Sequence, residues 1–202
     1  MANKTKRWAS GSIAGVAAII VYLLFTLIAY LLYPKSYSPL ASWLSELGNP
    51  LDSPSGSTVY RAGCILTAVA LIIFFVQLRK LNTGDRRMKI LLAVAQAAGV
   101  FSSLALIITG IFPFRTETAV HSLWSMILYI SLAFFEAFSA SVFLKYTSYP
   151  KWLGYYGIAA ATINVVAGAI FTAVVIGEWI TVATFIVYVG AIAYYSRLVE
   201  QA

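Results

Sequence analysis

Residues 12–33 read SIAGVAAIIVYLLFTLIAYLLY and contain no charged side chain. A helix needs about 20 mostly apolar residues to cross the hydrocarbon core of a bilayer, so this stretch is long enough to span one. Lys4, Lys6 and Arg7 precede it, as in a secretory signal peptide, but the apolar core of such a peptide is shorter. The stretch therefore predicts a first transmembrane helix that is retained.

Five more apolar stretches follow in the 202-residue chain, and Glu136 is the one charged residue that interrupts any of them, whereas Arg61, Lys89 and Arg197 lie at the ends of the spans given below. Charged residues make up 10% of the chain, whereas soluble domains carry about 25%. We therefore predict an all-α fold, a polytopic membrane protein with a six-transmembrane-helix bundle that forms a single membrane domain, residues 1–202. The predicted spans lie at about 12–33, 58–78, 89–112, 118–144, 152–175 and 179–197.

The Lys and Arg residues favour one orientation in the membrane. With the N-terminus in the cytoplasm, eleven of the 14 fall in cytoplasmic segments, and the outer segments hold only Lys35, Arg61 and Arg115. Cytoplasmic loops of membrane proteins carry this excess of basic residues, which also accounts for the net charge of +7 without a nucleic-acid partner. We predict a multi-pass protein of the cell membrane with cytoplasmic N- and C-termini and membrane lipids as partners.

The first outer loop, residues 34–58, is predicted to contain a short amphipathic helix. Ser38 can cap this helix, Pro39 suits its first turn, and Gly48 followed by Pro50 suits its end. Its apolar residues recur at helical spacing, as Leu40, Trp43, Leu44 and Leu47. We expect the helix to lie at the outer surface, either as a simple cap on the bundle or as a lid over a pocket.

Polar residues converge on the outer face where the third span ends and the fourth begins. Arg115, together with the N-terminus of the fourth helix, is suited to hold an anionic group such as a phosphate. The candidate ligand-binding residues are Arg115, His121, Glu46, Ser45 and Arg61. The imidazole of His121 can also act as a general base with a carboxylate partner. The candidate catalytic residues are His121, Glu46 and Asp52, and Ser45, Ser122 and Ser125 are available as nucleophiles.

A polar stripe on the fourth span predicts contacts inside the bundle. At helical spacing, the stripe consists of His121, Ser125, Glu136 and Ser139. Because a charge that faces lipid is costly, we expect the stripe to face the protein interior. Glu136, Gln96 and Asn164 lie at similar depth in three spans and are predicted to form a buried polar cluster. Such a cluster can hold helices together by hydrogen bonds, or relay a proton or ligand.

Motifs for other kinds of chemistry are missing from the sequence. The single cysteine, Cys64, excludes an intrachain disulfide. One histidine and scattered carboxylates lack the ligand spacing of a metal site, and no phosphate-loop or dinucleotide-binding motif occurs. We predict no metal and no cofactor.

Two short motifs resemble a known family. Residues 43–50 read WLSELGNP, which is similar to the Ser-Asp/Glu-Leu-Gly motif of domain-of-unknown-function family 998 (DUF998). Residues 110–113 read GIFP and precede His121, which resembles the Gly-x-Phe-Pro…His segment of that family. Its members look like small six-span proteins of archaea and bacteria, similar in layout to the Frag and DRAM membrane proteins. The resemblance implies no activity, but it points to Ser45, Glu46, Gly48, Pro113 and His121.

These features leave three functional hypotheses and a purely structural role. The first is binding of a lipid or small anionic ligand at the extracytoplasmic face, and we favour it. The second is a membrane-embedded enzyme that acts on lipid with a His/carboxylate pair. The third is a proton-coupled small transporter that uses Glu136, although the sequence shows no internal repeat of the kind that many transporters contain.

Overall fold

The computed structural model describes residues 5–81, 85–145, 148–169 and 174–201, which form six α-helices and two short 3-10 helices. The α-helices are α1 (Thr5–Leu31), α2 (Pro54–Gln77), α3 (Arg86–Ile111), α4 (Thr118–Lys145), α5 (Lys151–Ala169) and α6 (Ile176–Gln201). The 3-10 helix η1 (Leu44–Gly48) lies between α1 and α2, and η2 (Leu78–Lys80) follows α2. The predicted all-α fold is confirmed.

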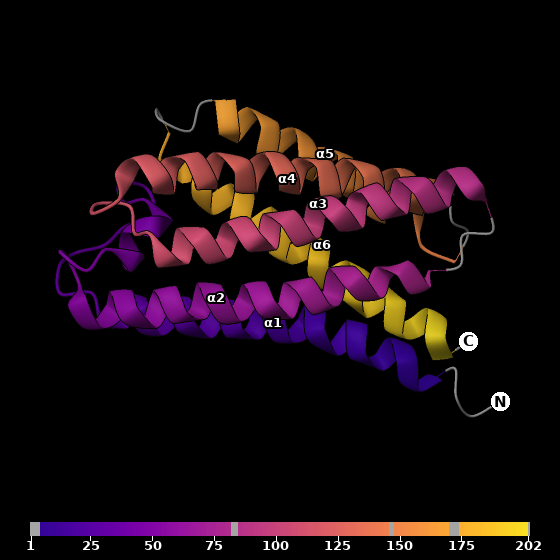
Figure 1. The fold of residues 1–202 in the computed structure, drawn as a ribbon, viewed down its shortest axis with the longest axis horizontal. Coiled ribbons are helices and arrows are strands. Elements are labelled where there is room, and N and C mark those ends of the chain that lie inside the picture. The colour runs from indigo at the N-terminus through magenta and orange to yellow at the C-terminus, as the bar shows by residue number, and fades with distance from the viewer. Residues whose placement is uncertain (1–4, 82–84, 146–147, 170–173, 202) are drawn as a thin grey trace.

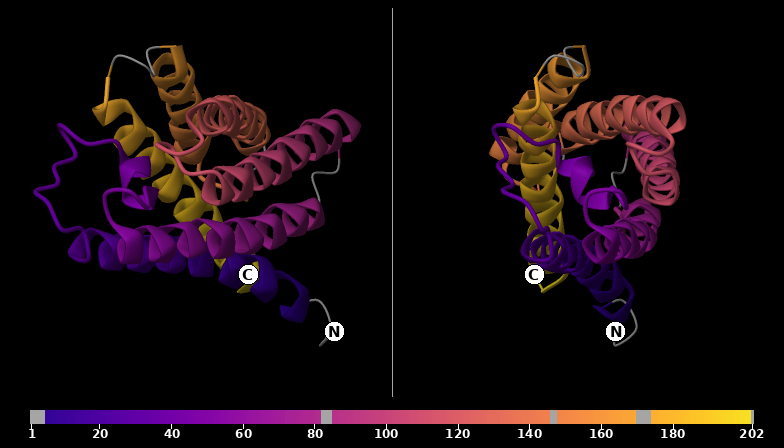
Figure 2. Two further views of the ribbon diagram at one scale, coloured as in Figure 1. Left: turned by 60° about the vertical axis from the view of Figure 1, so that its left-hand side comes forward. Right: turned by 90° about the vertical axis from the view of Figure 1, so that its left-hand side faces the viewer.

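Consecutive helices run antiparallel and pack into a closed ring. Each helix contacts the next one in chain order, and α6 returns to contact α1. Figure 1 shows the helices side by side along the long axis, and the right-hand view of Figure 2 shows the ring end-on. The start of α1 and the end of α6 lie at one end of the bundle, which we call the terminal end (Figure 1). The opposite end, which carries the connection between α1 and α2, is the loop end.

Five of the described helical segments are long and apolar enough to cross a membrane. They are Gly11–Leu31, Pro54–Gln77, Arg86–Ile111, Thr118–Lys145 and Ile176–Leu198. Each agrees with a predicted span to within a few residues, and several such helices in one chain are typical of a multi-pass membrane protein. The remaining predicted span, 152–175, coincides with α5 as far as Ala169 and then reaches residues 170–173, which lie outside the described residues.

Aromatic side chains connect helices across the interior of the ring. Phe75 of α2, Phe135 of α4 and Tyr188 of α6 are completely buried. The ring centroids of Phe75 and Phe135 lie 4.6 Å apart, and those of Phe135 and Tyr188 lie 5.9 Å apart. Such pairs contribute about 0.5–1.5 kcal/mol each beyond the burial of their area. The interior is therefore a packed core through much of its length.

The structure contains a shorter helix in the first loop than the sequence predicted. Ser38 caps only a single turn, in which its carbonyl accepts hydrogen bonds from the N–H groups of Ala41 (3.0 Å) and Ser42 (2.8 Å). Trp43 then adopts an extended backbone, with a ψ of 141°, so the turn does not continue as a helix. The chain becomes helical again only in η1, which ends at the predicted residue, Gly48.

The position of this segment also differs from the prediction. Leu40 is 79% exposed, whereas Leu44 is 2% exposed and Leu47 is completely buried. Leu44 and Leu47 pack in a cluster with Tyr22 of α1 and Tyr60 of α2. Burying a leucine side chain contributes about 1.5–3 kcal/mol, which favours insertion of η1 over a helix on the surface. As Figure 2 shows, η1 lies inside the loop end of the ring.

The close approach of α1 and α2 gives a testable prediction. A Cβ atom at Gly63 of α2 would overlap the Cβ of Phe25 in α1, and neither atom can move without its backbone. We expect Gly63→Ala to lower the free energy of unfolding by about 1–3 kcal/mol, even though alanine is intrinsically the better helix former. Thermal unfolding of the detergent-solubilised protein measures this loss.

Gly168→Ala in α5 is the matched control. A Cβ atom at Gly168 meets nothing within 4 Å, so this change should raise stability slightly. Equal melting temperatures for the two variants would contradict the packing of α1 against α2 described here.

Candidate functional site

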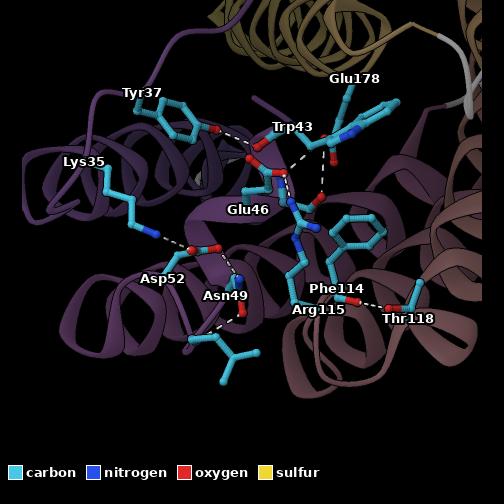
Figure 3. A network of polar contacts seen from close by, with 12 residues as sticks. Lys35, Tyr37, Trp43, Glu46, Asn49, Asp52, Phe114, Arg115, Thr118 and Glu178 are labelled. Carbon is cyan, nitrogen blue, oxygen red and sulfur yellow. Dashed lines mark hydrogen bonds and ion pairs between the residues drawn. The ribbon is translucent and has the colours of Figure 1, made fainter. Parts of the chain in front are cut away.

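The residues around η1 are anchored to α6 at the loop end (Figure 3). We call residues 42–49 the plug. The indole N–H of Trp179, in the first turn of α6, donates to the carbonyl of Ser42 at 3.1 Å. The backbone N–H of Ser45 donates to Oε2 of Glu178 at 3.3 Å, and the Ser45 hydroxyl lies 3.5 Å from the same oxygen. Two adjacent residues of α6 therefore hold the plug inside the ring.

Glu178 is the buried acidic residue at the centre of this arrangement. It is only 6% exposed, and the Tyr129 side chain of α4 is a further hydrogen-bond partner. Its place in the first turn of α6 is favourable, because a helix N-terminus stabilises a negative charge. The sequence does not identify Glu178 as a site residue, because a charged residue between two apolar stretches is expected to lie in the loop that connects two spans. Its partner Ser45 lies 133 positions away, and no local pattern relates the two residues.

A small cavity lies beneath the plug, and His121 and Glu178 both line it. Its volume is about 50 Å³, which is enough for a few water molecules, since one needs roughly 10–15 Å³. The polar residues of its wall are Tyr22, Ser45, Tyr60, Arg61, Thr109, His121, Ser125, Tyr129 and Glu178. Nδ1 of His121 donates to the carbonyl of Phe112 at 2.8 Å, and this bond fixes the orientation of the imidazole. The cavity thus brings together polar groups from the plug, α2, α4 and α6.

The chemistry available in this cavity is mainly hydrogen bonding. Its lining combines an imidazole, a carboxyl group, the guanidinium group of Arg61 and several hydroxyl groups with the buried thiol of Cys64. Within the part of the chain that the structure describes, no group of three or more His, Cys, Asp or Glu residues is placed to hold a metal ion. The side chains that line the cavity can form hydrogen bonds with hydroxyl, amine or amide groups of a ligand.

Arg115 and Glu46 form an ion pair at the rim of the loop end (Figure 3). Their N–O distance is 2.9 Å, and the Arg115 side chain is 53% exposed while that of Glu46 is 12% exposed. The guanidinium carbon lies 5.6 Å from the centroid of the Phe114 ring, and that ring lies 5.8 Å from the imidazole of His121. The Phe114 ring is thus close to both Arg115 and His121, and the charge of Arg115 is already paired with Glu46 of the plug.

Arg61 is engaged with the end of α3. Its Nε donates to the carbonyl of Gly110 at 2.7 Å, and a terminal nitrogen donates to the carbonyl of Ile111 at 2.9 Å. The last carbonyls of a helix have no partner within the helix, and a cation near them is favourable. Arg61 therefore caps α3, and two of its donors are unavailable to a ligand.

Asp52 belongs to a separate network in the loop (Figure 3). Its carboxylate pairs with Nζ of Lys35 at 2.9 Å and accepts a hydrogen bond from the Asn49 side-chain amide. The hydrogen bond from Lys35 holds the pKa of Asp52 below its ordinary value. Neither Asp52 nor Glu46 is among the described residues that line the His121 cavity, whose carboxylate is Glu178.

Two of the three residues of the predicted buried cluster meet in the structure. The side-chain amide of Asn164 in α5 donates to Oε2 of Glu136 in α4 at 2.5 Å, and both residues are buried. The amide of Gln96 donates instead to the carbonyls of Phe75 (3.0 Å) and Val76 (3.3 Å) at the end of α2. The structure thus brings Glu136 and Asn164 together and places Gln96 in a different contact.

Comparison with known proteins yields one family. The family described as protein of unknown function (DUF998) matches residues 16–198. No curated protein and no solved structure matches the chain. The matched region includes the plug and the segment from Gly110 to His121, which are the two stretches that form the rim and wall of the cavity.

The role of Arg61 can be tested by its removal. Arg61→Leu leaves the carbonyls of Gly110 and Ile111 without these donors. Hydrogen bonds from a charged group contribute about 1.5–3 kcal/mol, so we expect a loss of stability of that order. Chemical or thermal unfolding in detergent measures it. Full stability in the variant would mean that α3 needs no cap from α2.

The Lys35–Asp52 pair predicts a small dependence of stability on pH. Because the pKa of Asp52 is lower in the folded state, the pair stabilises the fold above the unfolded-state pKa, and this contribution is lost as the pH falls through the folded-state pKa. The effect should be small, because the Lys35 side chain is 66% exposed. Between about pH 5 and about pH 2, the melting temperature should fall less in Asp52→Asn than in the native protein. Parallel falls in the two proteins would rule out this contribution.

Proposed function

We propose that this chain, which belongs to the DUF998 family, is a six-span membrane protein that binds a lipid or other small amphiphile in the cavity beneath its plug. The spans proposed are the five long apolar helices and α5. α5 has 19 described residues, close to the length of about 20 that a crossing requires. It also occupies a place in the ring between α4 and α6.

The proposed orientation puts the terminal end in the cytoplasm and the plug outside. Support comes from the connections between α2 and α3 and between α4 and α5, which lie at the terminal end (Figure 1). These connections and the helix ends beside them carry Arg79, Arg86, Arg87, Lys145 and Lys151. Short cytoplasmic loops carry such an excess of basic residues, so both termini belong in the cytoplasm.

The observation that carries the binding proposal is that the polar cavity adjoins an apolar one. The second cavity has a volume of about 70 Å³ and is lined mainly by apolar residues of α1, α2, α3, α4 and α6. The two cavities have five lining residues in common, which are Tyr22, Leu106, Leu128, Tyr129 and Val182. A small molecule with a polar head and a hydrocarbon tail, or the end of a larger lipid, matches this succession of polar and apolar walls.

Thr67 supplies a second reason to place a ligand here. It lines the apolar cavity, and its hydroxyl oxygen is buried without a hydrogen-bond partner among the described residues. A buried hydroxyl without a partner costs about 1–3 kcal/mol. A polar atom of a ligand, or a water molecule beside it, removes this cost.

The residues around the cavity favour a neutral or cationic headgroup. The sequence favours an anionic group held by Arg115, but the Arg115 guanidinium is paired with Glu46. Two of the donors of Arg61 are used by carbonyls of α3, and the carboxylate of Glu178 lines the cavity. Since both guanidinium groups already have protein partners, we keep a lipid as the ligand and replace its anionic headgroup by one with hydroxyl or amine donors, which can hydrogen-bond to Glu178.

An enzyme that acts on lipid is the alternative that uses the same cavity. His121 and Glu178 line it together with the hydroxyls of Ser45 and Ser125, which are the residue types that general-base catalysis requires. The carboxylate of this alternative is Glu178, because Glu46 and Asp52 are paired with Arg115 and Lys35. The binding experiment below separates the two functions by the chemical state of the bound molecule.

The transporter alternative has less support. It requires a polar path from Glu136 to His121, and Gln96 was expected to contribute to it. The amide of Gln96 is engaged by carbonyls of α2. The apolar cavity, lined in part by Leu128 and Leu132 of α4, occupies the interior between the two polar sites.

Native mass spectrometry of the gently extracted protein tests the proposal. We expect a defined lipid-like species bound to the native protein and strongly reduced in Glu178→Gln and His121→Ala, since both residues line the cavity. Glu117→Gln is the matched control, because Glu117 is exposed and the same charge is removed. A bound intact lipid supports binding, whereas a cleaved product supports the enzyme.

Arg115→Ala distinguishes the cavity from the rim. We expect this variant to retain the bound species, because Arg115 pairs with Glu46 at the rim and does not line the cavity. Loss in Arg115→Ala with retention in both cavity variants would move the site to the rim and restore an anionic ligand. A native protein without any bound species would refute the proposal.

A further inference from the structure

A second concave feature lies on the side of the bundle, between α4 and α5. It is an apolar groove of about 700 Å³ that is open to the surroundings of the bundle. Its walls include Ile130 and Phe134 of α4 and Ile158, Val165 and Gly168 of α5. Several of these side chains are about half exposed, which suits contact with hydrocarbon. The groove is distinct from the cavity proposed above, because His121, Glu178 and Ser45 do not line it, although Tyr129 borders both.

Asn164 is a buried polar residue in the wall of this groove, which also includes the buried Tyr129. Asn164 is 1% exposed, and its amide nitrogen is bound to Oε2 of Glu136. The other oxygen of each side chain, Oδ1 of Asn164 and Oε1 of Glu136, is buried and has no hydrogen-bond partner among the described residues. Oδ1 of Asn164 is an acceptor, and Oε1 of Glu136 is one when its carboxyl group is ionised, so a hydrogen-bond donor is missing beside Asn164. Leaving two such atoms without partners in an apolar setting is costly.

The position of Asn164 indicates where the donor must lie on a ligand. The α5 wall of the groove runs from Ile158 to Ala169, a distance of about 16 Å at the helical rise per residue. Asn164 lies near the middle of this wall. A hydrocarbon chain that fills the groove therefore passes Asn164 partway along its length, and a headgroup at the chain end would lie beyond it.

We propose that the α4–α5 groove binds a lipid chain that carries a neutral hydrogen-bond donor, such as a hydroxyl, partway along the chain. The apolar walls accommodate the hydrocarbon, and the hydroxyl donates to Oδ1 of Asn164, the member of the pair that lines the groove. A plain hydrocarbon chain fills the same groove but leaves both oxygens without a partner. The groove thus selects hydroxylated chains over unsubstituted ones.

A matched pair of probes tests this selection. The methyl ester of stearic acid with a mid-chain hydroxyl and methyl stearate differ only by that hydroxyl, and both are uncharged. Competitive binding to the purified full-length protein, read by native mass spectrometry, should favour the hydroxylated ester by roughly tenfold, the worth of about one hydrogen bond. Equal binding of the two esters would overturn the proposal and would mean that the two oxygens share a proton or a water molecule instead.

Replacing both Glu136 and Asn164 removes the polar pair, so that neither side chain is left buried without the other. In the double variant Glu136→Leu with Asn164→Leu, both polar side chains become apolar, a change that can be nearly neutral for stability, unlike loss of one partner alone. Its melting temperature verifies that it folds. We expect it to bind the two esters equally well. A preference for the hydroxylated ester that persists in the double variant would overturn the role of this pair.

A third variant blocks the groove itself. Because a Cβ atom at Gly168 meets nothing within 4 Å, Gly168→Leu can fill the groove without disturbing the packing of α5. It should weaken binding of both esters. Gly177→Leu is the control, since its Cβ lies at an ordinary 3.7 Å from Ala167 and Gly177 does not line the groove. Unchanged binding in Gly168→Leu would place the chain elsewhere on the protein.

Discussion

A carboxylate inside an apolar bundle must be hydrogen-bonded, and at the loop end this requirement is met by Glu178 and the plug together. The donors come from Ser45 and Tyr129, and the first turn of α6 adds its favourable dipole. Ser45 can reach Glu178 only if η1 enters the ring, and Leu44 and Leu47 stabilise that insertion by their burial. The cavity beneath the plug is the space that remains between this contact and the side chains of α2, α3 and α4.

The two arginines of the loop end, Arg61 and Arg115, also connect the segments that surround the cavity. Arg61 caps the last carbonyls of α3, and Arg115 joins the start of α4 to the plug through Glu46. Each arginine therefore connects two segments that are distant in sequence. An unpaired guanidinium beside the cavity would have favoured an anion, but both groups have protein partners. The remaining lining is dominated by hydroxyls, an imidazole and one carboxylate, and this determines the class of ligand that we propose.

Hydropathy alone predicted the helices because a bilayer-length apolar helix is specified by local composition. Gly11–Leu31 and Thr118–Lys145 correspond to predicted spans for this reason. The plug was not predictable in the same way. Its apolar stripe fits a surface helix as well as it fits a buried turn, and the choice depends on a contact with α6. Glu178 was missed and Gln96 was assigned to the wrong neighbours, because neither hydropathy nor helical spacing specifies which faces of two helices meet.

The buried pair of Glu136 and Asn164 has more unmet hydrogen-bonding capacity than simple attachment of two helices requires. Ser139, one turn along α4, shows what such an attachment looks like: its hydroxyl bonds the Phe135 carbonyl at 2.6 Å and the Tyr188 hydroxyl at 2.9 Å. Glu136 and Asn164 have one hydrogen bond between them, and the other oxygen of each side chain has no partner among the described residues. Two amide side chains, or an amide and a hydroxyl, would join α4 to α5 without leaving these oxygens unpartnered. Asn164 lines an open groove, and its unpartnered oxygen is therefore better explained by a donor that arrives from outside the chain.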